Sequence, residues 1–415
     1  MRFGFSNSIE RNNFYLYLMG TFVSQLGSVL YTFVMSLYIL KLTDSGVYFS
    51  LNLAISMIPI VFIMPLAGVL ADRWDKKSIV VIMDLLSGLL LVGLYVFIYK
   101  RGITLALVYS TTFILSIFSA VFDIGFSSAK IDLVLEERLI VLNSTGDIIS
   151  SLTRIIGPLV GGLLFSIIDT RTFILINGIS FVLSGISEVF IDFDFNKKRN
   201  TRINNKFLED IKLGYQYIIN RKDIKSILQI FIIINLALSL SVTVPLPYII
   251  NNTLKLGTKS YGIIQAGFPI GLIIGASLIS RFLKRMTYEK IFKSSLLIFS
   301  ILIAVFGVVL FTKDIIRLNN LSYLTYYLIV VAIMGIFISF IDIPVLTYLQ
   351  TRTSPNYLGR VMGIGMSVVK VTTPLAYILS GFLLDNLEAR YVVLLGSLIC
   401  LIYFSNIRKT QFIKD

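Results

Sequence analysis

Residues 68–77 of the chain read Gly68-Val69-Leu70-Ala71-Asp72-Arg73-Trp74-Asp75-Lys76-Lys77. This short charged stretch stands between two apolar runs, at residues 48–70 and 78–99. Each run is long enough to cross a bilayer, because a spanning helix needs roughly 20 apolar residues. We therefore expect a tight turn at a membrane surface, where the lack of a side chain at Gly68 lets two helices approach closely.

The rest of the chain repeats this alternation of apolar runs and short polar loops. Its 415 residues are 56% hydrophobic and only 14% charged, whereas soluble domains carry about 25% charged residues. The sequence therefore predicts an all-α membrane protein with twelve transmembrane helices. The first apolar run is too long for a signal peptide, so it counts as the first span. The predicted spans are residues 14–40, 48–70, 78–99, 103–127, 139–168, 172–192, 226–250, 260–282, 290–312, 321–347, 358–384 and 390–406.

The placement of basic residues predicts the orientation of these spans. With the N-terminus in the cytoplasm, 26 of the 37 Lys and Arg residues fall in cytoplasmic segments and nine fall in the opposite loops. Lys and Arg concentrate on the cytoplasmic side of membrane proteins. We therefore expect a multi-pass protein of the cell inner or plasma membrane with both termini in the cytoplasm. The net charge of +14 is attributed to these loops, and nucleic acid is not expected as a partner.

A long basic segment divides the spans into six and six. The predicted domains are a six-helix bundle at residues 1–195, a cytoplasmic linker at 196–225 with a surface helix over 205–220, and a second six-helix bundle at 226–415. The two halves share features at similar offsets: Asp123 matches Asp342, and Pro158 matches Pro374. Such offsets indicate an internal repeat, and six-span repeats form one known transporter architecture.

The stretch 68–77 resembles the signature loop of the major facilitator superfamily, except that Asp75 replaces the usual small residue. The resemblance implies the major facilitator fold and a conformational clasp on the cytoplasmic side. In it Asp72 meets the start of span 11 and Arg73 pairs with an acid of span 4. The clasp residues expected here are Gly68, Asp72, Arg73, Lys76, Lys77, Asp123, Gly359 and Arg360. The alternative is that these charges are solvated and only set topology. A weaker second clasp would pair Asp342 with Arg281 or Arg285.

A second motif lies in span 5, where Gly157-Pro158-Leu159-Val160-Gly161-Gly162 resembles a motif of the antiporter branch of this superfamily. Proline bends a helix and glycines permit close packing. Gly157, Pro158, Gly161 and Gly162 therefore form either a hinge or an ordinary packing surface. Further similarity at residues 22–28, 143–144 and 359–363 points to the branch of macrolide efflux pumps and enterobactin exporters. That branch implies export driven by an ion gradient, usually of protons.

Ionisable residues within apolar spans are expensive and often functional. Arg154 and Lys370 are the candidates for cavity-facing charges, and Asp147 is a candidate proton carrier. Asp84, Asp147 and Glu188 lie nearer the cytoplasmic ends, where snorkelling or a structural ion pair is the favoured interpretation and proton transport is the alternative. The resemblance places the substrate cavity along spans 1, 4, 7 and 10, where the candidate residues are Gln25, Tyr31 and Asn235. Pro245 and Pro247 are expected to break the end of span 7.

Composition limits the remaining alternatives. The chain has no His and one Cys, which excludes a Cys/His metal site and a disulfide framework. No Gly-rich phosphate loop is present, so neither an enzyme nor a bound cofactor is expected. We expect proton-coupled efflux of amphipathic small molecules, a macrolide or other drug, by a monomer using a proton or other ion gradient. A siderophore or metabolite exporter is the alternative, followed by a channel or a membrane sensor that does not transport.

Overall fold

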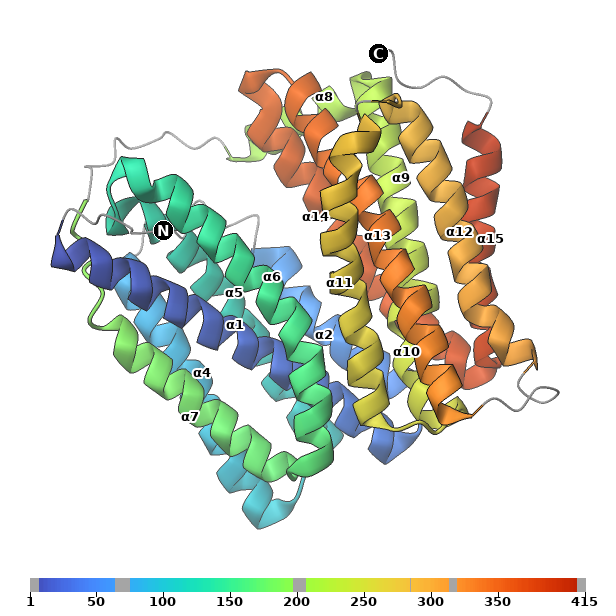
Figure 1. The fold of residues 1–415 in the computed structure, drawn as a ribbon. Coiled ribbons are helices and arrows are strands. Elements are labelled where there is room, and N and C mark those ends of the chain that lie inside the picture. The colour runs from blue at the N-terminus through green and yellow to red at the C-terminus, as the bar shows by residue number, and fades with distance from the viewer. Residues whose placement is uncertain (1–6, 64–74, 197–206, 284, 313–318, 409–415) are drawn as a thin grey trace. The chain divides into compact units, whose positions relative to one another are not determined.

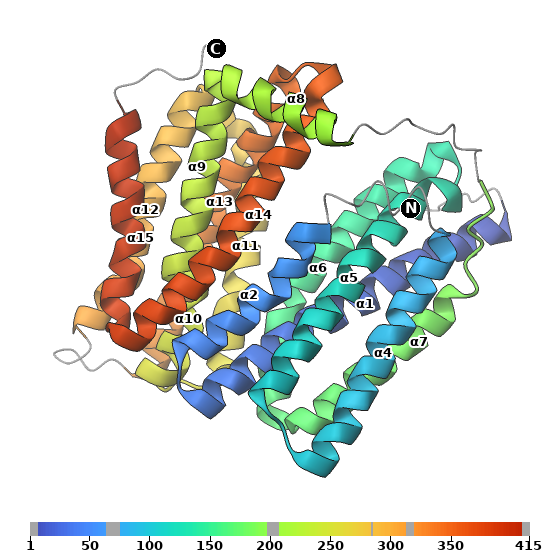
Figure 2. The same ribbon diagram turned by 180° about the vertical axis from the view of Figure 1, so that it is seen from behind.

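The computed structural model describes residues 7–63, 75–196, 207–283, 285–312 and 319–408. Within these ranges the chain is helical and has no strand. Twelve helices in the described part are long and apolar enough to cross a membrane, as the sequence predicts. Figures 1 and 2 show them as long rods joined mostly by short loops.

The helices of the first half follow the predicted apolar runs, several of them with extra polar turns at the ends. They are α1 (Ser8–Thr43), α2 (Gly46–Ile63), α4 (Lys76–Arg101), α5 (Leu105–Leu133), α6 (Glu136–Ile167) and α7 (Thr170–Glu188). Short polar side chains fix several helix starts, because they accept hydrogen bonds from free N–H groups of the first turn. Asp75 does this for α4, Thr104 for α5 and Asp169 for α7.

The second half begins with α8 (Phe207–Asn220), within the basic linker. The helices that follow are α9 (Lys222–Leu238), α10 (Pro245–Tyr248), α11 (Thr258–Leu283), α12 (Tyr288–Thr312), α13 (Asn320–Arg352), α14 (Pro355–Asn386) and α15 (Ala389–Ile407). In Figure 2, α8 runs across the end of this half where α9 begins. Apolar and polar residues segregate on α8, as expected for a surface helix.

The prolines of span 7 do not break the helix, contrary to expectation. Instead, π-helical turns over Ser239–Thr243 and Ile249–Thr253 flank the short helix α10, which starts at Pro245. A π turn bonds to the fifth residue along and therefore accommodates a missing N–H without ending the helix. Residues Lys222–Thr253 consequently form one continuous span.

Packing divides the chain into two compact units. Unit 1 comprises Met1–Tyr38 and Ile55–Ile203, and unit 2 comprises Ile39–Ala54 and Asn204–Asp415. The hairpin at residues 39–54, where α1 ends and α2 begins, therefore belongs to unit 2.

Each unit contains one especially close helix pair, visible in both ribbon views as α4 beside α7 and α11 beside α13. In unit 2, a Cβ atom added at Gly335 would lie 2.1 Å from the carbonyl oxygen of Phe268. One added at Gly271 would lie 1.9 Å from the carbonyl oxygen of Ala332. Glycine is thus required at both positions, since any side chain would push the two backbones apart.

Candidate functional site

The charged stretch 68–77 is described only from Asp75 onward. Asp75 caps α4, because its Oδ2 accepts hydrogen bonds from the Ser78 backbone N–H (2.9 Å) and hydroxyl (2.7 Å). Lys76 reaches across to α5, where its Nζ lies 2.5 Å from Asp132 Oδ2 and donates to the Ser128 carbonyl oxygen at 3.0 Å. Asp132 is buried, so Lys76 ties the start of α4 to the end of α5 rather than standing free in solvent.

Other members of the expected clasp are placed only in part. Lys77 is half-buried at the start of α4, and Asp123 is exposed on α5. Gly359 and Arg360 lie in the first turns of α14. Gly68, Asp72 and Arg73 fall outside the described residues, so their expected contacts stay predictions.

The Gly-Pro motif packs α6 against α1. A Cβ atom at Gly157 would lie 2.5 Å from Val29 Cγ1, and one at Gly161 would lie 2.7 Å from Phe33 Cδ1. Pro158 and Gly162 are also buried. The helix continues through the proline as a single element, so the close approach is observed while a hinge motion stays a prediction.

A polar stripe runs along α6 beside this packing surface. Its members are spaced three or four residues apart, and all four are exposed: Ser144, Asp147, Ser151 and Arg154. Residues at this spacing share one face of a helix. Asp147 and Arg154, predicted separately, are thus brought onto one face, about 10 Å apart along the axis at 1.5 Å per residue.

The expected cavity residues of the other helices have different surroundings. Tyr31 is fully buried, with its hydroxyl near Thr111 and Thr112 of α5. Gln25 is half-buried on α1. In unit 2, the amide of Asn235 donates to the Phe231 carbonyl oxygen one turn earlier, at 2.9 Å. Lys370 is half-buried on α14.

Asp84 and Glu188 are buried rather than snorkelling, and among the described residues neither forms an ion pair with a basic residue, contrary to the favoured interpretation. Asp84 of α4 is 1% exposed, and Glu188 of α7 is 0% exposed. Ser24 of α1 donates its hydroxyl to Asp84 Oδ2, and Ser184 donates to Glu188 Oε1 at 3.3 Å. The two serine Oγ atoms lie 3.2 Å apart. The sequence does contain one signal for this cluster: both acids interrupt apolar runs, and Ser184 precedes Glu188 by one turn.

The second clasp expected in unit 2 is not formed. Among the described residues, Asp342 makes no ion pair with Arg281 or Arg285, both of which are exposed. Asp342 is instead half-buried within α13. The repeat therefore preserves the position of the acid without its expected partner.

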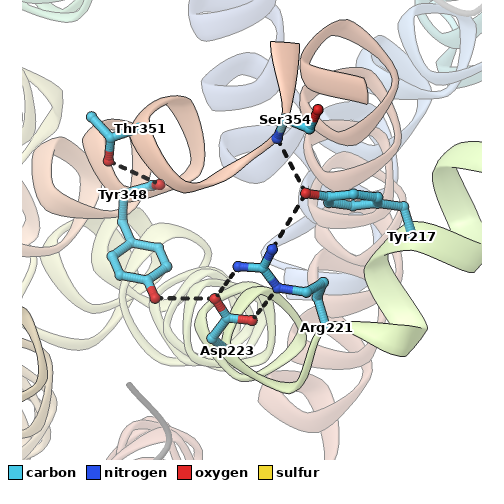
Figure 3. Close-up of polar contacts among 6 residues, drawn as sticks. All are labelled: Tyr217, Arg221, Asp223, Tyr348, Thr351 and Ser354. Carbon is cyan, nitrogen blue, oxygen red and sulfur yellow. Dashed lines mark hydrogen bonds and ion pairs between the residues drawn. The ribbon is translucent and has the colours of Figure 1, made fainter. Parts of the chain in front are cut away.

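A different polar network joins four helices at one end of unit 2, as Figure 3 shows. Arg221 binds Asp223 through two hydrogen bonds, of 2.7 and 3.0 Å, and Tyr348 of α13 donates to the same carboxylate at 3.1 Å. The Tyr217 hydroxyl of α8 accepts from the Ser354 N–H at 3.1 Å, just before α14. From the sequence, Arg221 is only one of the basic residues of the linker at 196–225, because the links of its neighbours Asp223 and Tyr217 to Tyr348 and Ser354 join segments distant in the chain.

The hairpin at 39–54 is capped from α14. Asp385 accepts hydrogen bonds from the Gly46 N–H at 2.6 Å, the Val47 N–H at 3.4 Å and the Ser45 hydroxyl. A carboxylate at a helix N-terminus satisfies free N–H groups and favours the helix dipole. Asp385 therefore fixes the start of α2 within unit 2.

The sequence is similar to one protein family and to two macrolide efflux proteins. A family model described as Major Facilitator Superfamily matches residues 17–363 and 226–407. Macrolide efflux protein A of Streptococcus pyogenes is 24% identical over 395 residues, which cover 93% of both chains. The protein of the same name from Enterococcus faecalis is 24% identical and aligns with 80% of this chain and 99% of its own.

Solved structures agree on the fold. The nucleoside transporter NupG superimposes with a TM-score of 0.70 at 14% identity, covering 98% of this chain and 100% of its own. A bacterial homologue of the iron transporter ferroportin, in an inward-facing state, gives a TM-score of 0.70 at 15% identity. That match covers 97% of this chain and 100% of the other. Identities this low establish a shared fold and nothing about substrate.

Proposed function

The chain belongs to the Major Facilitator Superfamily, and we propose that it is a proton-coupled exporter of amphipathic small molecules, macrolides among them, that works by alternating access. The names of the two macrolide efflux relatives support the substrate class and the direction. The Lys and Arg asymmetry supports a location in the cell membrane with both termini in the cytoplasm.

The observation that carries the proposal is the polar stripe of α6. A charged side chain facing lipid at the middle of a span costs about 2.5–3.5 kcal/mol on insertion scales. Asp147 and Arg154 are exposed on a helix that is otherwise apolar enough to span the membrane. An aqueous cavity along this face of α6 avoids that cost, and such a cavity is what a transporter of water-borne substrates requires.

A second candidate is an exporter of anionic metabolites or siderophores. The exposed guanidinium of Arg154 favours it, because arginine binds carboxylates through paired hydrogen bonds. Asp147 on the same face weakens this candidate, since its negative charge offsets the cation for any substrate that contacts both.

The two candidates separate in one experiment. The chain is expressed in a bacterium that lacks its major efflux pumps, and accumulation of erythromycin, ethidium and enterobactin is measured with and without a protonophore. Drug export predicts that erythromycin accumulation falls severalfold below the empty-vector control and recovers when the protonophore is added. A fall for enterobactin alone supports the anion exporter, and no fall for any probe contradicts both.

A further inference from the structure

Two buried carboxyl groups of unit 1 take no part in the proposed substrate pathway. Asp84 and Glu188 lie where α4, α7 and α1 meet, and both side chains are buried. Ser24 donates to Asp84 and Ser184 donates to Glu188, and the two serine Oγ atoms lie 3.2 Å apart, so a pair of hydroxyl groups links the two acids.

Within the described part of the chain, neither Asp84 nor Glu188 forms an ion pair with Lys or Arg. Two carboxylates linked through hydroxyl groups in one buried site cannot both remain ionised, because repulsion adds to the loss of solvation. At least one proton must therefore reside on the pair when the helices are packed as observed.

One oxygen of the pair is left without a partner. Glu188 Oε2 is buried and accepts or donates no hydrogen bond within the described structure. An unpaired buried polar atom costs about 1–3 kcal/mol, so it is usually retained for a reason other than stability. A carboxyl oxygen free of hydrogen bonds is available to gain or release a proton when the surroundings open.

Space for Glu188 is made by a glycine of α1. A Cβ atom at Gly20 would lie 2.7 Å from Glu188 Oε1 and 3.2 Å from the ring of Phe126. A purely structural contact would be filled at lower cost by apolar side chains, since buried charges gain little from such sites. The glycine thus accommodates an acid where an apolar contact would be simpler.

We propose that Asp84 and Glu188 form a proton-binding site, in which one carboxylate takes up a proton from water and the neutral pair is the state packed between α1, α4 and α7. The inference rests on the proposed function, because it names the residues that couple transport to protons. Release of the proton leaves a repelling pair, which favours separation of these helices. Binding forms one O–H bond and removes one negative charge.

Asp123 of α5 is a further charged group near the pair, and its side chain is exposed. From α1 the pair is faced by Gly20 and Ser24, and from α7 by Ser184, none of which titrates near neutral pH. The pair is therefore the titrating unit at this junction.

The test compares net transport with exchange. Asp84→Asn and Glu188→Gln keep the side-chain size and the hydroxyl contacts but cannot carry the proton. In proteoliposomes with an internal pH dye and erythromycin as the probe, both variants should lose transport driven by a pH gradient and keep counterflow. Asp169→Asn is the control: hydrogen bonds from the Thr172 hydroxyl and N–H lower the pKa of Asp169, so it stays ionised near neutral pH. That control should keep both activities.

The outcomes distinguish failure of the proposed function from failure of the proton-binding site. If the wild type does not couple erythromycin to protons, the proposed function fails; if it does and both variants match it, the proton site fails. Coupling of the wild type to a sodium gradient that is lost in the variants identifies a sodium site and overturns the proton assignment.

A second pair of variants covers the case in which the substitutions unfold the protein. Gly20→Ala moves Glu188 without removing it and should shift the pH dependence of transport, whereas Gly93→Ala, which has open space around it, should not. Infrared spectra supply a readout without transport: the carbonyl band of a protonated carboxyl should be present in the wild type and reduced in Glu188→Gln. An unchanged band contradicts the proposal.

Discussion

Arg154 carries a charge on an exposed face of α6, within a span rather than in a loop. If this face borders the substrate pathway, Arg154→Gln should lower transport at least severalfold, while Arg154→Lys keeps the charge and part of the activity. Efflux of erythromycin from whole cells measures this, normalised to the amount of protein in the membrane.

Arg171→Gln provides the matched control for this prediction. Arg171 is also exposed, but it lies at the start of α7, next to the loop. Its loss should leave transport near the wild-type rate. Equal rates for Arg154→Gln and the wild type would place Arg154 outside the pathway and remove the main support for the cavity along α6.

Asp385 permits a second prediction at this scale. Replacement of a helix-capping side chain by Ala costs about 1 kcal/mol, and Asp385 accepts hydrogen bonds from two N–H groups and a hydroxyl of the 39–54 hairpin. Asp385→Ala should therefore lower the midpoint of thermal unfolding in detergent, measured by intrinsic fluorescence. Glu388→Ala is the control, because its ion pair with Arg390 at 2.8 Å is a surface pair of little energetic value. Equal midpoints for the two variants would refute the capping role.

At the scale of helices, the contact between α11 and α13 depends on glycine. Gly335→Ala adds a methyl group 2.1 Å from a carbonyl oxygen of the facing helix, which is shorter than any tolerated contact. Overpacking of this kind typically costs about 1–3 kcal/mol. The variant should unfold at lower temperature than the wild type and yield less monodisperse protein.

Gly93→Ala tests the opposite situation. Nothing lies within 4 Å of the added methyl group on α4, and Ala is favoured over Gly in a helix by about 1 kcal/mol. This variant should be as stable as the wild type or slightly more so. If both alanine variants had the same effect on stability, close backbone contact would not explain why glycine is required between α11 and α13.

The helices themselves could be predicted well from the sequence, because each apolar run is long and the bilayer fixes its length. The contacts between helices could not be predicted from the sequence. Asp84 and Glu188 lie in different spans, and hydropathy indicates that a span is apolar without indicating which helix it touches. The same limit explains why Lys76 was not assigned to Asp132, and why Asp223 and Tyr217 were not assigned to Tyr348 and Ser354.

The prolines of span 7 also led to a wrong prediction. Pro245 and Pro247 predict an interrupted helix, since each removes a backbone donor. The π turns on either side of α10 provide another solution that no single-residue rule predicts. The pairing of Asp342 with Arg281 or Arg285 was wrong for a comparable reason, because a matching position in the repeat does not bring a matching partner among the described residues.

For the whole molecule, the sequence halves and the packed units differ in one respect. The predicted boundary lies in the linker at 196–225, whereas packing also assigns Ile39–Ala54 to unit 2. The linker helix is fixed on the same unit, because Tyr217 and Asp223 connect α8 and α9 to α14 and α13. Unit 2 thus contains the hairpin at 39–54 and the linker helix α8 as well as the helices of the second half.

The orientation of the molecule gives the last prediction. Cys400 is buried and is the only cysteine, so a Cys400→Ala background is expected to fold and to give no labelling of its own. Into it, Lys100→Cys in the last turn of α4 or Glu137→Cys in the first turn of α6 is introduced, so that the two exposed positions lie on either side of α5 in the chain. With the N-terminus in the cytoplasm, a membrane-impermeant maleimide should label Lys100→Cys in intact cells and Glu137→Cys only after permeabilisation. The reverse pattern would invert the topology and, with it, the assignment of the 68–77 stretch to the cytoplasmic face. Labelling of both in intact cells would contradict the count of spans between them.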